Sequence, residues 1–135
     1  MRVFFCLFIF ICLSCSKSDT NSPNFCEPVL FDGSKFNSFE NFRIKLIEYS
    51  LDDLCLSVKL GISGCDADHT IEMISGGSIL ISDPGQIVFD FYDNSLQLCE
   101  AYFILEREYD LSPIQEIYAG EIIVKFRDNN GSVNL

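Results

Sequence analysis

Residues 54–63, with the sequence LCLSVKLGIS, decide the fold that we expect for this chain. The even-numbered positions carry only leucine, valine or isoleucine, and the odd-numbered positions carry cysteine, serine, lysine or glycine. Alternation with a period of two places all of the apolar side chains on one face of a β-strand. The stretch therefore predicts a strand with one buried face and one open face.

The same pattern recurs along the chain, with turn-forming residues between the repeats. Further strands are predicted at 42–49, 69–74, 78–82, 87–92, 99–106 and 122–127. Residues typical of turns separate them at 63–64, 76–77, 83–85, 93–95 and 128–131. About seven short strands at this spacing predict an all-β, immunoglobulin-like β-sandwich, with an up-and-down barrel as the alternative. We expect no helix longer than one turn in this domain.

The N-terminal end has the pattern of an export leader. Arg2 supplies one positive charge, and residues 3–13 (VFFCLFIFICL) are apolar without interruption. This run has the length of a signal-peptide core and is shorter than the roughly 17–25 residues that span a bilayer. Residues 1–14 are therefore predicted to be a signal peptide.

The predicted signal peptide ends at a cysteine that can carry lipid. Residues 12–15 (CLSC) resemble a lipobox, in which small residues precede a cysteine that is acylated and becomes the mature N-terminus. The leucine lies one position later than usual, so cleavage by the ordinary signal peptidase is the alternative. Acyl chains such as palmitate contribute about 0.8 kcal/mol per buried CH₂ to anchoring. We expect Cys15 to attach the protein to the lipid bilayer.

The segment after Cys15 refines the predicted address. Residues 16–24 (SKSDTNSPN) are polar and predict a flexible tether, so we divide the mature chain into a tether at 15–25 and one domain at 26–135. Ser16 takes the place where many inner-membrane lipoproteins carry aspartate, and SKSD is similar to half of a surface-directing motif. These features indicate the cell envelope, at the outer membrane, on its periplasmic or surface face.

The charge of the mature chain excludes some partners. The chain has 9 basic and 20 acidic side chains, and loss of Arg2 with the leader leaves 8 basic, for a net charge near −12. Such acidity argues against nucleic acid and against anionic lipid head groups, both of which favour basic surfaces.

Four of the seven cysteines remain for the domain, because two lie in the leader and Cys15 is assigned to lipid. An even number in a small exported domain predicts two disulfides. Zinc is the alternative, but the chain has no CxxC pair and a single histidine. Strand parity places Cys99 on an apolar face and Cys55 on a polar face, so we predict the pairs Cys65–Cys99, pinning the core, and Cys26–Cys55, fastening the N-terminal arm.

Five short motifs then suggest a family. They are CEPV at 26–29, DLCL at 53–56, SGC at 63–65, CEA at 99–101 and YDLSP at 109–113. Together they resemble a group of small four-cysteine β-sandwich lipoproteins of the Gram-negative envelope, over residues 26 to about 126. The resemblance implies structure and carries no activity.

Candidate chemistry is sparse in this sequence. His69 follows Asp66 and Asp68, a combination that can serve as a general base or as metal ligands. The sequence, however, offers no serine or cysteine nucleophile in a recognisable pattern with it. We interpret it as a turn or rim histidine. Asp90 and Asp93 lack the spacing of an EF-hand, and the acids at 106, 108 and 110 fit an exposed strand edge. We predict no enzyme, no cofactor and no catalytic or metal site.

Two functions remain open from the sequence. The favoured one is a membrane-anchored envelope lipoprotein whose β-sandwich is a binding or structural module for a protein or a glycan. The alternative is a secreted or anchored ligand or metal carrier that uses the acidic turn of Asp66, Asp68 and His69. A flat exposed patch with Tyr92 and Tyr102 favours the first, whereas converging aspartate and histidine side chains favour the second.

Overall fold

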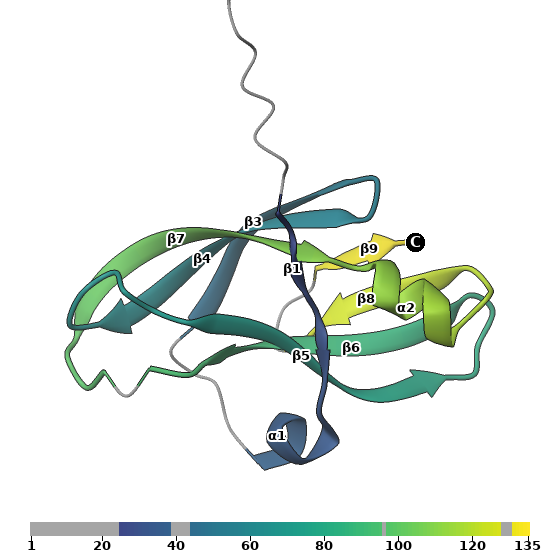
Figure 1. The fold of residues 1–135 in the computed structure, drawn as a ribbon, viewed down its shortest axis with the longest axis horizontal. Coiled ribbons are helices and arrows are strands. Elements are labelled where there is room, and N and C mark those ends of the chain that lie inside the picture. Colours follow the sequence, from purple (N-terminus) through teal and green to yellow (C-terminus); the bar gives the residue numbers. More distant parts are fainter. Residues whose placement is uncertain (1–24, 39–43, 96, 128–130) are drawn as a thin grey trace, which may run out of the picture.

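We describe the protein in a computed structural model, which covers residues 25–38, 44–95, 97–127 and 131–135 (Figure 1). These residues form two β-sheets that enclose one hydrophobic core. Sheet 1 has the strand order β1 (Glu27–Pro28), β7 (Ala101–Asp110), β4 (Cys55–Gly64) and β3 (Ile44–Asp52). Sheet 2 has the order β2 (Leu30–Phe31), β5 (Ile71–Leu80), β6 (Gly85–Asp93), β8 (Ile122–Phe126) and β9 (Ser132–Asn134). The predicted all-β sandwich with two disulfides is confirmed.

The deciding stretch of sequence forms β4, in the interior of sheet 1 and antiparallel to both β3 and β7. The side chains of Leu56, Leu60 and Ile62 are fully buried, whereas Lys59 on the opposite face is only half-buried. The predicted alternation is therefore confirmed. The strand begins at Cys55, because the preceding residues make the turn from β3, in which Asp53 has a positive φ of 54°.

The pairing of the strands adds a feature that the sequence did not indicate. The pairs β1–β7, β2–β5 and β6–β8 are parallel, whereas the sheets of an immunoglobulin domain are antiparallel. The chain changes sheets between β1 and β2 at the buried Val29. Two short parallel pairings therefore fasten the N-terminal arm to both layers.

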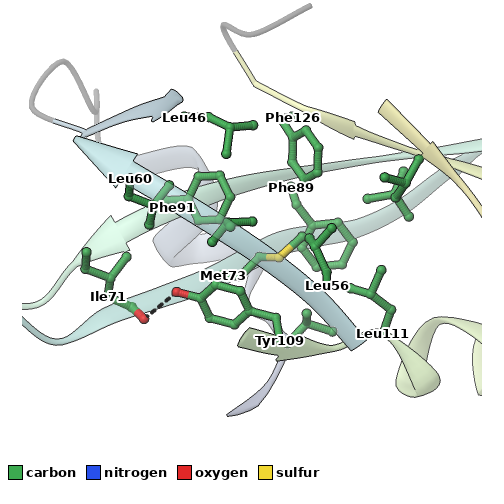
Figure 2. Packing of buried hydrophobic residues seen from close by; sticks show 14 of the residues in the cluster. Leu46, Leu56, Leu60, Ile71, Met73, Phe89, Phe91, Tyr109, Leu111 and Phe126 are labelled. Atoms are coloured by element: carbon green, nitrogen blue, oxygen red, sulfur yellow. Dashed lines mark hydrogen bonds between the residues drawn. The ribbon is translucent and has the colours of Figure 1, made fainter. Parts of the chain in front are cut away.

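The core lies between the two sheets, and one tyrosine joins them (Figure 2). Tyr109 of β7 is 1% exposed, and its Oη donates a hydrogen bond of 2.8 Å to the carbonyl oxygen of Ile71 on β5. Burial raises the pKa of the Tyr109 phenol. Phe91 packs between Tyr109 and Phe126, at ring-centroid distances of 6.0 and 5.9 Å.

Residues 76–77 do not separate two strands, so this part of the prediction was wrong. β5 runs without a break from Ile71 to Leu80, and its register against β6 shifts between Ser75 and Ile79. Gly77 has a φ of 74°, which glycine adopts without strain. The two glycines therefore form a bulge within one strand.

Two helices of six residues each are longer than the single turn that we expected, so that prediction was also wrong. They are α1 (Gly33–Ser38) and α2 (Ser112–Ile117). The Asp32 carboxylate caps α1 by accepting a hydrogen bond of 2.9 Å from the Lys35 N–H, and this bond lowers the Asp32 pKa. Proline lies in the first turn of α2, where its missing N–H costs nothing.

Helix α1 packs on the outer face of sheet 2, over β5. Phe36 lies against Gly76, and the Arg127 guanidinium stacks 3.7 Å from the centre of the Phe36 ring. Lys35 pairs with Glu72. Ile74 is consequently fully buried, although it has the opposite parity to the core-facing Met73 on the same strand.

Candidate functional site

The predicted lipid attachment site, Cys15, lies outside the described residues, as do the signal peptide and the tether up to residue 24. Among the residues that the structure describes, no helix is long and apolar enough to cross a membrane. The lipid anchor therefore stays a prediction.

Both predicted disulfides are confirmed as pairs, and one of the two reasons given for them was wrong. Cys26 joins Cys55 and Cys65 joins Cys99, with Cα–Cα distances of 6.0 and 4.6 Å. Cys55 faces away from the core on β4 and receives the N-terminal arm, as expected. Cys99, however, precedes β7, and both Cys65 and Cys99 are exposed. This disulfide therefore closes two loops at the surface and does not pin the core.

His69 is neither a turn nor a rim histidine, because its side chain is fully buried. Its Nδ1 lies 2.9 Å from Asp93 Oδ2 and 2.9 Å from Ser95 Oγ. The Asp93 carboxylate can only accept a hydrogen bond, so Nδ1 must be the donor. In the neutral ring the proton therefore resides on Nδ1. The other ring nitrogen, Nε2, has no hydrogen-bond partner among the residues that the structure describes, and a side chain at Gly64 would collide with it.

Histidine, aspartate and serine come together here without the geometry of a catalytic triad. In a triad the histidine contacts the nucleophile through one ring nitrogen and the carboxylate through the other. Here Ser95 and Asp93 both contact Nδ1 of His69, and Ser95 Oγ is also 2.7 Å from Asp93 Oδ1. The arrangement is a buried network through Nδ1 of His69 that fixes the 93–95 turn against the start of β5.

The acidic turn does not assemble the ligands that the carrier alternative needs. Gln97 organises it: its Oε1 accepts hydrogen bonds from the N–H groups of Cys65 and Asp66, and its Nε2 donates to Asp66 Oδ1 and to the Asp68 carbonyl oxygen. Asp66 and Asp68 are exposed, whereas His69 turns inward. Their side chains therefore do not converge on one point.

Within the described part of the chain, one group of potential metal ligands is close-packed. Its ligand atoms, from Cys26, Cys55 and Glu108, lie within 4.8 Å of one another. The two sulfurs are bonded to each other, and a metal-binding cysteine must be a free thiolate. This group therefore marks where the N-terminal arm crosses the sheet.

The outer face of sheet 1 carries an exposed apolar cluster, which we call the Gly61 patch. It consists of Ile47, Tyr102 and Ile104, which are 41%, 58% and 59% exposed. Ile104 lies opposite Gly61 in the β4–β7 register, and Ile47 is the extra residue of a bulge in β3. A side chain at Gly61 would collide with the Tyr102 phenol and touch Ile47. Glycine thus lets the tyrosine lie across β4.

The other half of this face is charged and hollowed. A groove of about 730 Å³ runs beside β1 and over β3, β4 and β7, with Phe25 at one wall. Lys59 lies between Glu48 and Glu106, with Nζ–O distances of 2.9 and 3.7 Å. The hydrogen bond to Glu48 raises the pKa of Lys59. Among the described residues, the Glu108 carboxylate accepts a single, long hydrogen bond, at 3.5 Å from the Ser57 hydroxyl.

Tyr92 and Tyr102, whose joint exposed patch would favour a binding face, lie on different sheets. Tyr102 belongs to the Gly61 patch on sheet 1, whereas Tyr92 is half-buried on sheet 2 with the Lys35 ammonium 4.4 Å from its ring centre. The two residues therefore do not form that patch, and of the two only Tyr102 contributes to an exposed face.

Comparison with protein-family models, curated proteins and solved structures found no match for this chain.

Proposed function

We propose that the protein is an envelope lipoprotein, anchored through Cys15, whose sandwich domain binds a partner with the outer face of sheet 1. One observation supports the proposed binding role of the domain. The Gly61 patch is exposed on this face, whereas α1 packs on β5 at the outer face of sheet 2, where Ile74 is buried. Contiguous exposed apolar side chains with a polar surround are typical of interaction sites.

The anchor is supported by the sequence alone, and the structure describes the N-terminal arm that follows the predicted tether. The Cys26–Cys55 disulfide holds the arm on sheet 1, next to the groove that Phe25 and Glu27 line. Phe25, where the described chain begins, therefore lies beside the proposed binding face. Nothing in this arrangement requires catalysis, and a non-catalytic binding module is the function that the exposed face supports best.

The anchor and the face can be tested in the same cells. Cys15→Ala should abolish fatty-acid labelling and move the protein to the soluble fraction or leave an uncleaved precursor. Labelling that persists in this variant would remove the lipidation proposal.

For the binding face, a photo-crosslinking amino acid should replace Ile104 in the full-length chain, with Ile81 as the matched position. Ile81 is fully exposed but follows β5 on sheet 2. We expect a discrete crosslinked product from position 104 and none from position 81. Equal products from both positions, or none from 104, would contradict a specific face on sheet 1.

A further inference from the structure

The outward side chains of β7 form a ladder with an apolar half and an acidic half. Tyr102, Ile104, Glu106 and Glu108 occupy alternate positions of one strand, so successive side chains are about 6.8 Å apart on the same face. All four are exposed, and the Glu106 side chain is 78% accessible. A partner that follows β7 would meet apolar contacts first and carboxylates next.

The acidic half has an excess of negative charge. The described lining of the groove carries the acids Glu27, Glu48, Glu106 and Glu108 and the bases Lys59 and Arg107; four negative charges against two positive charges leave a net charge of −2. Lys45 is opposite Gly61, at the apolar end. The chain as a whole has a net charge of −11, so its field attracts cations toward the groove.

The edge of β7 next to this ladder has features that hinder pairing with an additional strand. β1 pairs only with Tyr109 and Asp110. Arg107 shares the inward parity of the buried Val58 opposite it, and its Nη1 and Nη2 donate to the carbonyl oxygens of Glu106 and His69. An inward-pointing charge on an edge strand hinders pairing with another strand. A partner therefore contacts the side chains of the face.

We propose that the partner is a basic polypeptide segment that covers the Gly61 patch with apolar side chains and places lysine or arginine against Glu106 and Glu108. This inference rests on the proposed binding face and adds the chemistry of its partner. Charge complementarity selects the partner, because a basic segment neutralises the excess carboxylates, whereas a neutral glycan only donates hydrogen bonds to them. Apolar cover of Tyr102 and Ile104 supplies the contact area at the centre of the interface.

The test uses the full-length chain purified in detergent and a short synthetic peptide with two isoleucines and two lysines at alternating positions. A matched peptide replaces the lysines with glutamates, and a third replaces the isoleucines with serines. Fluorescence anisotropy should show binding of the basic peptide that weakens with salt. We expect the other two peptides to bind at least tenfold more weakly.

Variants then locate the binding. Glu106→Gln with Glu108→Gln should weaken the basic peptide about tenfold, because two surface charge pairs are lost. Glu116→Gln with Glu121→Gln changes the net charge equally, at exposed positions on α2 and just before β8, and should have little effect. Ile104→Ser should weaken binding, whereas Ile81→Ser should not. All four substituted glutamates are exposed, so the variants are expected to fold.

Each other outcome overturns the proposal in a distinct way. Equal losses in both glutamate pairs would reduce the effect to bulk charge. Binding of a neutral oligosaccharide that depends on Tyr102 but not on Glu106 or Glu108 would keep the face and replace the partner class. If all three peptides bind, and if Ile104→Ser does not weaken their binding, both the proposed partner class and the proposed binding face would be wrong.

Discussion

Tyr109→Phe removes one oxygen atom from the centre of the sandwich and tests how the two sheets are joined. The lost group is the Oη that donates to the Ile71 carbonyl oxygen at 2.8 Å, in a residue that is 1% exposed. A buried hydrogen bond contributes about 1 kcal/mol, and the orphaned carbonyl adds a small penalty. The free energy of unfolding at neutral pH should therefore fall by about 1–1.5 kcal/mol.

The same substitution should become harmless in alkali. Burial raises the Tyr109 pKa in the folded protein, whereas in the unfolded chain the phenol ionises from about pH 10. Above pH 10 the unfolded state binds fewer protons than the folded state, so the stability of the wild-type protein falls as pH rises. By pH 11 this loss is about 1.4 kcal/mol. Phenylalanine lacks the ionisation, so the two stability curves should cross near pH 11.

Urea unfolding followed by far-ultraviolet circular dichroism at several pH values from 7 to 11.5 measures both effects. Tyr102→Phe is the matched control, because its phenol is at the surface and 58% of the residue is exposed; it should change stability little at any of these values. Equal stabilities of wild type and Tyr109→Phe at neutral pH would refute the inter-sheet hydrogen bond. A difference that stays constant up to pH 11.5 would refute the buried, protonated phenol.

The remaining predictions concern His69 and the disulfides. His69→Ala should lower the free energy of unfolding by about 2–4 kcal/mol, because a fully buried ring and its contact to Asp93 are lost; a loss below 1 kcal/mol in urea unfolding would return this residue to the rim. The bridges close separations of 29 and 34 residues, so each contributes about 3.5–4 kcal/mol in the chain-entropy model. Cys26 and Cys55 are half-buried, whereas Cys65 and Cys99 are exposed. Replacing Cys26 and Cys55 by alanine should therefore lower the free energy of unfolding at least as much as replacing Cys65 and Cys99. A clearly larger loss of stability from the Cys65 and Cys99 replacement in urea unfolding would contradict this ranking.

Strand periodicity predicted the layers because it reports which face of a strand is buried. It identified β4 and the face of that strand that is buried. It failed for Cys99, since that residue lies before the strand begins, and for the breaks at 76–77, since a glycine pair can form a bulge as readily as a turn. β1 and β2 are two residues long, too short for any period to appear.

The candidate face needed the structure for a different reason. A bulge in β3 leaves Ile47 as an extra residue between Leu46 and Glu48, and a one-residue shift changes the face of every later side chain, so Glu48 lies beside Lys59 on the outer face. The buried network of His69 was equally hidden. Pairing of Ile71 with Asp93 in the β5–β6 ladder brings Asp93 beside the histidine.

If the outer face of sheet 1 is the binding surface, a basic peptide must change the surroundings of that face. Nitrogen-15 NMR titration of the full-length chain with the basic peptide measures this, because each backbone amide reports its own surroundings. We expect chemical-shift changes to concentrate on the amides of Gly61, Tyr102, Ile104 and Glu106 and to leave α1 unchanged. Changes that concentrate on α1, or that spread evenly over both sheets, would show that sheet 1 is not the binding surface.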